Sequence, residues 1–221
     1  MSKTVLYEFD VSPFCEKVRR ILHYKGVPYV RRECAAMTPM QWKKINHRAK
    51  FPALVHEGKT VVDSSDIARF LEGEAPERPL IPEDSGQRAF VELLEDWADE
   101  SLFWYEVYLR FGVKENAERV AAHIASHVLP PLRPIAMRLV PWKTMEQARA
   151  QGIGRKPLEV VLEELRGHYA MLATFLRDRP YLSGPGLTLA DIAVSAQLWA
   201  LIDSGQRPEI EKHPRLAAWY D

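Results

Sequence analysis

Residues 9–19, FDVSPFCEKVR, mark the point where a strand ends and a helix begins, and they decide the fold. Pro13 suits a first helical position because its φ is fixed and its missing N–H costs nothing there. Ser12 is therefore the N-cap, at a helix end whose unpaired N–H groups and dipole favour an anion such as a thiolate. Taken alone, Ser12 is predicted only to cap the helix.

The segments around this stretch predict a small mixed sheet. Apolar, β-branched and aromatic residues indicate a strand before Ser12, and helical spacing then continues to Gly26, which is a good helix stop. Strands and helices follow in the order β-α-β-α-β-β-α, and the first strand, helix and strand form a right-handed parallel unit. The expected strands cover residues 4–9, 29–33, 53–56 and 60–62, and the later helices cover residues 40–47 and 63–74.

A proline-rich segment then divides the chain. We expect an α/β domain at residues 1–75, a linker at 76–84 and an all-α helical-bundle domain at 85–221. Residues 130–155 contain four prolines, so we expect broken helices there, with a turn rather than a phosphate-binding loop at Gly152-Ile153-Gly154. The helical patterns of the second domain cover residues 87–111, 116–129, 158–177, 189–202 and 215–220.

Composition limits the classes of partner. The chain has 221 residues, 47% of them hydrophobic, and its 30 Lys and Arg balance its 30 Asp and Glu. No overall field attracts nucleic acid or an acidic membrane, and no apolar run is long enough to span a bilayer. Two cysteines, Cys15 and Cys34, and an N-terminus without a signal peptide predict a cytoplasmic location.

Three further motifs each have a structural interpretation. Phe51-Pro52 precedes a strand, and the general preference of X–Pro bonds is for trans. Asp63-Ser64 opens a helix, where it could cap the helix or bind a carboxylate. Thr188-Leu189-Ala190-Asp191 has capping-box spacing, and we interpret it as structural.

Two other features are predicted to have no ligand. His123 and His127 are four residues apart on a helix, but no glutamate lies between them and the sequence shows no third ligand, so we expect no metal. The aromatic helix that contains Trp104 is expected to contribute mainly to the core, with one face bordering a cleft.

Together, Ser12 to Arg19, Asn46 to Pro52, Val62 to Ile67 and Gly184 to Asp191 resemble the cytosolic glutathione S-transferase family, with its serine-type classes. The resemblance covers nearly the whole chain. It implies a thioredoxin-like first domain that binds glutathione, an all-α domain that forms most of the electrophile pocket, a homodimer and a role in detoxification.

The resemblance also assigns residues. Ser12 matches the serine that hydrogen-bonds the glutathione sulfur, and Pro52 matches a cis-proline preceded by Lys50 and Phe51. Asp63 and Ser64 match the pair that holds the γ-glutamyl end. A donor and a helix dipole at the thiol lower its pKa and so activate the nucleophile. The expected electrophile pocket contains Val11 and Phe14 together with residues of the aromatic helix, namely Trp104, Tyr105, Tyr108 and Phe111.

Departures from the family pattern leave alternatives open. The usual Asn-Pro-x-Gly-x-Val-Pro is Asn-His-Arg-Ala-Lys-Phe-Pro at residues 46–52, and the usual Glu-Ser is Asp63-Ser64. A second hypothesis is therefore a glutathione-binding or stress-response protein with little or no turnover. A third, a thiol reductase, requires chemistry at Cys15, which we expect to be a buried bystander although a mixed disulfide with glutathione is conceivable.

Overall fold

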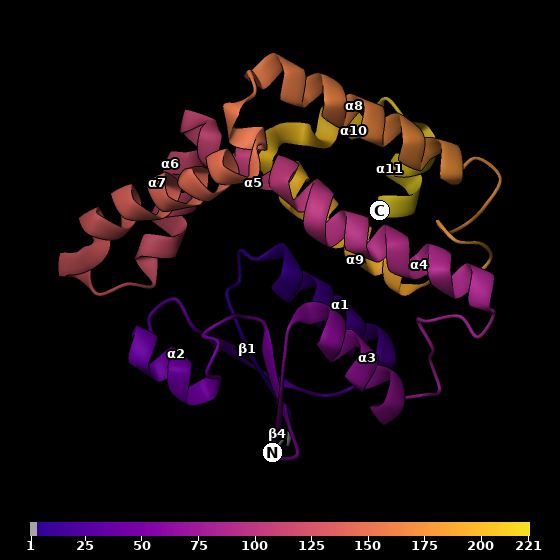
Figure 1. Cartoon of the computed structure of the whole chain (residues 1–221), viewed down its shortest axis with the longest axis horizontal. Helices are drawn as coiled ribbons and strands as arrows, with labels where there is room; N and C mark the ends of the chain where they lie inside the picture. Colours follow the sequence, from indigo (N-terminus) through magenta and orange to yellow (C-terminus); the bar gives the residue numbers. More distant parts are fainter. Residues whose placement is uncertain (1–3) are drawn as a thin grey trace.

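The computed structural model describes residues 4–221, and it divides into a sheet-containing part and a helical part (Figure 1). The sheet has the strand order β2-β1-β3-β4, from β1 (Thr4–Glu8), β2 (Val30–Glu33), β3 (Ala53–His56) and β4 (Lys59–Val62). β1 pairs in parallel with β2 and antiparallel with β3, placing Leu6 opposite Leu54. The predicted β-α-β-α-β-β-α order and the parallel first unit are confirmed.

Three helices complete this part. They are α1 (Pro13–Lys25), α2 (Pro39–Ile45) and α3 (Ser64–Glu74). Ser12 caps α1, and Gly26 ends it in the left-handed conformation, with φ 69°, that glycine adopts without steric cost. α1 buries its apolar stripe, including Val18 and Ile21, against the sheet.

The second part is helical throughout, as predicted. It begins with α4 (Ser85–Trp97), which continues through a π-helical turn (Ala98–Leu102) into α5 (Phe103–Gly112). A hairpin of α6 (Lys114–Ser126) and α7 (Arg133–Gln151) follows. The chain then forms α8 (Leu158–Phe175), α9 (Leu189–Leu201), a second π-helical turn (Ile202–Gln206), α10 (Arg207–Glu211) and α11 (Pro214–Tyr220).

The prediction of broken helices at residues 130–155 is wrong for most of that range. Two prolines form a short 3-10 turn (Pro130–Leu132), and a second 3-10 turn covers Ile153–Arg155, but α7 between them is continuous for 19 residues. Pro134 lies in the first turn of α7, where its missing N–H is not needed. Pro141 lies inside the helix without ending it, in a helix that packs against both α5 and α6.

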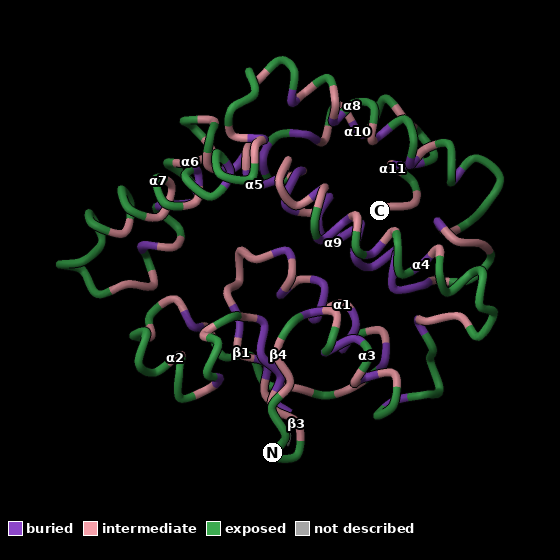
Figure 2. Tube along the Cα trace, viewed as in Figure 1, coloured by how far each residue is buried: buried purple, intermediate pink, exposed green. Residues whose placement is uncertain are grey.

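The two parts share a hydrophobic core. Leu6, Leu54 and Ile67 from the sheet part pack in one buried cluster with Leu189 and Ile192 of α9. Figure 2 shows the buried residues concentrated where α9 and α4 face α1. The relative position of the two parts is therefore fixed by packing rather than by the linker.

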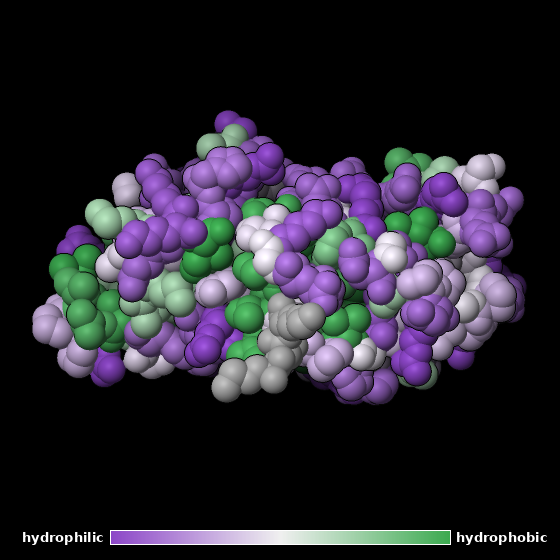
Figure 3. All heavy atoms as spheres, turned by 90° about the horizontal axis from the view of Figure 1, so that it is seen from below, coloured by the Kyte–Doolittle hydropathy of each residue, from purple (hydrophilic) through white to green (hydrophobic). Residues whose placement is uncertain are grey.

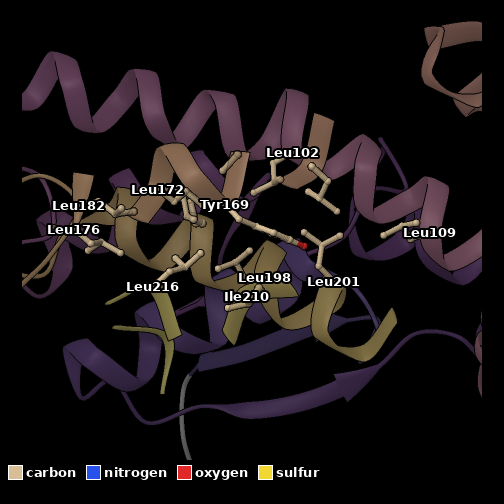
Figure 4. Packing of buried hydrophobic residues seen from close by; sticks show 14 residues of the cluster. Leu102, Leu109, Tyr169, Leu172, Leu176, Leu182, Leu198, Leu201, Ile210 and Leu216 are labelled. Carbon is tan, nitrogen blue, oxygen red and sulfur yellow. The ribbon is translucent and has the colours of Figure 1, made fainter. Parts of the chain in front are cut away.

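A second core lies among the helices around Tyr169, whose ring is fully buried and whose hydroxyl ends beside Leu201 (Figure 4). Asp191 ties this core together, since its carboxylate accepts hydrogen bonds from the N–H groups of Thr188 and Leu182 and from the Trp219 indole. The capping box at Thr188 is confirmed. In residues 4–221, none of the helices has the length and apolar character needed to cross a membrane.

Candidate functional site: a serine at an interdomain cavity

Ser12 lies at the N-terminus of α1 in the turn that follows β1. Its hydroxyl oxygen accepts a hydrogen bond from the Cys15 N–H at 3.4 Å, and its own N–H donates to Phe9 C=O at 3.0 Å. The capping contact uses Ser12 as an acceptor, so its O–H proton is available for an external partner. The side chain is part of the lining of a cavity between the two parts. Ser12 can therefore both cap the helix and donate to a ligand in that cavity.

Cys15 is not placed to bind a ligand or to react in this cavity. It is fully buried, its sulfur accepts from the Phe9 N–H at 3.4 Å, and burial raises the pKa of its thiol to about 12. Cys34 is also buried, and burial raises its thiol pKa to about 12 as well. Since the thiolate is the reactive form, both side chains are chemically quiet at neutral pH.

We therefore expect neither cysteine to react with iodoacetamide in the folded protein at pH 8, whereas both react after unfolding. Mass spectrometry of the alkylated protein, with and without denaturant, measures this directly. Rapid labelling of Cys15 in the folded state would contradict the assignment and revive the thiol reductase hypothesis.

The Phe51-Pro52 bond is cis, as the resemblance implies. Asn46 holds the turn that leads to it, because its buried amide donates to Lys50 C=O at 2.9 Å and accepts from the Lys50 N–H at 3.3 Å. The ring of Phe51 packs edge-on against Phe9 at 5.4 Å, just before the Ser12 turn. Lys50, Phe51 and Pro52 thus lie on the same side of the sheet part as Ser12.

Asp63 and Ser64 begin α3. Asp63 has a positive φ of 87°, and its carboxylate accepts from the Ser65 N–H at 3.0 Å, so it is the N-cap. Ser64 is buried, and its hydroxyl donates to Asp99 of the π-helical turn at 3.4 Å. These contacts fix both residues at the start of α3.

A buried charge cluster supports the start of α3, and sequence reasoning missed it. Lys17 is only 1% exposed, and its ammonium donates to Glu95 at 2.5 Å, to Asp99 at 2.6 Å and to Ser65 at 3.3 Å. Burial raises the pKa of Asp99, and the Lys17 charge opposes that rise. The cluster joins α1, α3 and the end of α4, so it fixes the two helix N-termini relative to each other.

The cavity beside Ser12 has a volume of about 490 Å³ and is formed by both parts of the chain. Of the predicted pocket residues, Val11, Phe14 and Phe111 belong to its lining. Its other aromatic walls come from Phe9, Trp42 and Phe103.

Trp104, Tyr105 and Tyr108 do not belong to this lining, so the prediction that they border the pocket is corrected. Tyr105 and Tyr108 are turned toward other partners: the Tyr105 hydroxyl donates to Glu164 at 2.9 Å, and the Tyr108 hydroxyl donates to Lys156 C=O at 2.9 Å. Trp104 packs against Phe103, which is itself part of the lining, with ring centroids 5.2 Å apart. Aromatic residues occur on more than one face of α5. Their number alone therefore does not tell which of them line the cavity.

A buried ion pair connects the cavity to the Ser12 turn. Arg110 donates to Glu106 at 2.5 Å and to Val11 C=O at 2.7 Å, and both charged side chains line the cavity. Burial raises the pKa of Glu106, and the Arg110 charge opposes it. Arg110 thereby ties α5 to the residue that precedes Ser12.

Family models match both parts of the chain. The model described as the glutathione S-transferase N-terminal domain matches residues 6–79, and the model of the C-terminal domain matches residues 146–221. Protein LigF from Sphingobium sp. is 31% identical over 235 residues, an alignment that covers 98% of this chain and 87% of LigF. This chain belongs to the glutathione S-transferase family.

Other relatives agree with that assignment. The transferase is 25% identical to an isoprene-epoxide glutathione S-transferase from Rhodococcus sp., over 90% of this chain and 83% of the relative. The crystal structure of the beta-etherase LigF superimposes with a TM-score of 0.68 at 28% identity, covering 99% of this chain and 93% of that one. A glutathione S-transferase from Rhodospirillum rubrum, at 24% identity and a TM-score of 0.70, has the same fold.

These relatives confirm the predicted fold and activity. The transferase binds glutathione and is an enzyme of the class that transfers it to electrophilic small molecules. The thioredoxin-like first domain and all-α second domain are those of the family.

Proposed function

We propose that the transferase activates glutathione through Ser12 and uses the adjacent cavity for an aromatic electrophile. The observation that carries this proposal is the position of Ser12, which caps α1 as an acceptor while lining the 490 Å³ cavity. An oriented hydroxyl and a helix N-terminus both stabilise a thiolate more than a thiol, so the bound thiol has a lowered pKa.

Glutathione then extends along the end of the sheet. Its thiol lies at Ser12, its backbone pairs with Phe51 next to Pro52 as an added strand would, and its γ-glutamyl carboxylate lies at the start of α3 near Asp63 and Ser64. Lys50 is placed by Asn46 at the edge of the same surface. The rigid charge cluster around Lys17 supports this geometry because it holds α1 and α3 together.

The electrophile is proposed to be an aryl ether that loses a phenolate. LigF, which is named a beta-etherase, is similar to the transferase over nearly its whole length, and aromatic side chains form much of the cavity wall. In such a reaction the glutathione sulfur forms a bond to the carbon that bears the aryloxy group. The carbon–oxygen bond breaks, its electron pair leaves with the phenolate oxygen, and water protonates that oxygen.

The test compares three electrophiles with glutathione: a ketone with an aryloxy group on the adjacent carbon, a 1,2-epoxide and an aryl halide. We expect release of the phenol together with an equal amount of thioether from the aryl ether at the highest kcat/KM. Turnover of the epoxide or the halide alone would contradict the etherase proposal and leave the transferase assignment intact.

Cavity variants sharpen the same test. Replacing Phe111 with Ala should raise KM for the aryl ether by about tenfold, since it removes apolar contact from the pocket, with the KM for glutathione unchanged. Tyr108→Phe is the matched control on the other face of α5 and should change neither KM. Equal effects of the two variants would contradict the placement of the electrophile.

The proposal also covers the oligomeric state and the cellular location. We infer that two copies of the chain pair and that the protein works in the cytoplasm in detoxification, as the family resemblance implies. The helices of residues 4–221, which lack a membrane-spanning candidate, fit that location. Light scattering of the purified protein measures the pairing, and a mass of 25.4 kDa, that of a single chain, would contradict it.

A further inference from the structure

Asp10 lies beside His123 of α6 and His127, the C-cap of that helix, next to the Ser12 turn. The Asp10 carboxylate is 2.8 Å from Nε2 of His123 and 3.5 Å from Nε2 of His127. The two rings are one helical turn apart, with centroids separated by 5.2 Å. One ligand atom from each residue can be chosen so that all three atoms lie within 4.8 Å of one another.

This arrangement supplies the third ligand that the sequence pattern of the two histidines did not show. Two histidines at i and i+4 present their rings on one helix face, but two ligands do not make a closed metal site. The third ligand comes from a residue 113 positions away, which the fold of α6 over the β1–α1 turn brings into place. Two imidazoles and one carboxylate are a donor set that zinc and similar divalent ions bind.

The distances fit a small metal ion. Zinc–nitrogen and zinc–oxygen bonds of about 2.0–2.2 Å in a tetrahedral site place ligand atoms roughly 3.4 Å apart. The two separations at Asp10, 2.8 and 3.5 Å, lie on either side of that value. The three ligand atoms together lie within 4.8 Å of one another, so the side chains must draw closer to bind one ion.

The position of His127 Nε2 is a second observation at this site. That atom is inaccessible and has no hydrogen-bond partner among the described residues, although 31% of the side chain is exposed and the Asp10 carboxylate lies 3.5 Å away, within ion-pair range. The hydrogen bond with Asp10 explains the position of His123, but it does not explain why a second imidazole nitrogen is turned toward the same carboxylate. A buried polar atom without a partner is costly, and a metal ion at this point removes the cost.

The surrounding charges do not compete for the site. Each nearby arginine has a carboxylate partner of its own. These pairs are Arg119 with Asp203, Arg110 with Glu106, and Arg19 with Glu8 and Glu16. Arg19 reaches Asp10 only through its backbone C=O, at 3.1 Å. Glu33 adds negative charge nearby, since its carboxylate accepts from the Asp10 N–H at 2.8 Å. None of these three arginine side chains pairs with the Asp10 carboxylate.

We propose that Asp10, His123 and His127 bind one divalent transition-metal ion, of which zinc is the type that the donor set suits, at the rim of the electrophile cavity. Asp10 and His127 line the 490 Å³ cavity, and Asp10 and His123 line a smaller neighbouring cavity of about 280 Å³. A fourth coordination position is thus open to both cavities, where water or an oxygen of a bound molecule completes the site.

The test uses the full chain without a histidine tag, in buffer free of glutathione, because both would bind zinc. Calorimetric titration with zinc should give one ion per chain. Asp10→Asn and His127→Gln should each weaken binding by at least about tenfold. His213→Gln, which changes a histidine at the start of α11, is the matched control and should bind zinc as the original chain does.

Cobalt provides a spectroscopic check. The cobalt-loaded chain should show visible absorption of a tetrahedral nitrogen and oxygen site without a thiolate-to-metal band, which excludes Cys15 and Cys34 as ligands. A thiolate band, or zinc binding that is equally strong in His127→Gln and His213→Gln, would overturn the proposal.

A measurement on the unmutated chain covers the case in which a variant does not fold. Zinc should slow the modification of His123 and His127 by diethyl pyrocarbonate at least about tenfold, as mass spectrometry of peptides reads out, and should leave His213 unaffected. Equal modification rates with and without zinc at all three histidines would also overturn the proposal.

Discussion

Replacing Ser12 with alanine is expected to lower kcat/KM for glutathione transfer by roughly 10²–10³-fold, because it removes a preorganised donor at the atom where charge is concentrated. Affinity for glutathione should change little, since the remaining contacts of the peptide are elsewhere. The pKa of the bound thiol, followed by thiolate ultraviolet absorbance, should rise toward the value of about 8.5 of a free thiol.

Ser85→Ala is the matched control, because Ser85 also begins a helix but is exposed and is not among the cavity residues. Loss of the Ser12 cap also costs about 1 kcal/mol of stability, so both variants should be compared well below their unfolding temperatures. An unchanged thiol pKa in Ser12→Ala, with unchanged turnover, would show that Ser12 only caps α1.

Replacing Lys17 with methionine is expected to lower the free energy of unfolding by about 3–5 kcal/mol, because it leaves two buried carboxylates without their cation. Glu95 and Asp99 are both nearly inaccessible, and both lie within 2.6 Å of the Lys17 ammonium. Denaturant unfolding of the variant and the original chain measures the difference.

The loss should depend on pH with a definite sign. Burial already raises the pKa of Asp99, and removing the Lys17 charge raises it further, so the penalty is complete above the folded-state pKa and shrinks as pH falls. The variant should therefore lose less stability at pH 5 than at pH 8. Lys114→Met, at a lysine that is 81% exposed, is the control and should stay within about 0.5 kcal/mol.

A charge-neutral variant makes the prediction specific. Combining Lys17→Met with Glu95→Gln and Asp99→Asn should recover part of the lost stability, because it removes the uncompensated charges. A single-variant loss below about 1 kcal/mol, or no recovery in the combined variant, would show that the cluster is not energetically important.

Local signals were sufficient to predict most of the fold. α1 begins at Pro13 and ends at Gly26, as the preferences for proline in the first turn and glycine after the last turn predict. The capping box at Thr188 starts α9. Pro141 was misleading, because the rule that proline ends a helix is local, whereas α7 packs along α5 and α6 over its length. Helix packing outweighed the propensity of one residue.

The site was predictable only where its residues follow one another in the chain. Ser12, Phe51-Pro52 and Asp63-Ser64 each belong to a short motif, and the resemblance of these motifs to the family, taken together, made them candidates for the proposed glutathione site. Arg110 and Val11 are 99 residues apart, and Lys17 and Asp99 are 82 apart, so no sequence spacing joins them. The missed face of α5 had another cause, since aromatic residues on both of its faces hide the helical period.

The turn between β1 and α1 is attached to the helical part at two successive residues, Asp10 and Val11. Arg110 of α5 holds the Val11 C=O, and His123 of α6 holds the Asp10 side chain. Ser12 is the next residue along this turn. A displacement of α6 would therefore act on this turn through the Asp10 side chain, two residues before Ser12, whereas a displacement of α5 would act on the Val11 backbone, one residue before it. At the far end of that hairpin, exposed apolar side chains gather (Figure 3), including Leu129, Ile135 and Leu139.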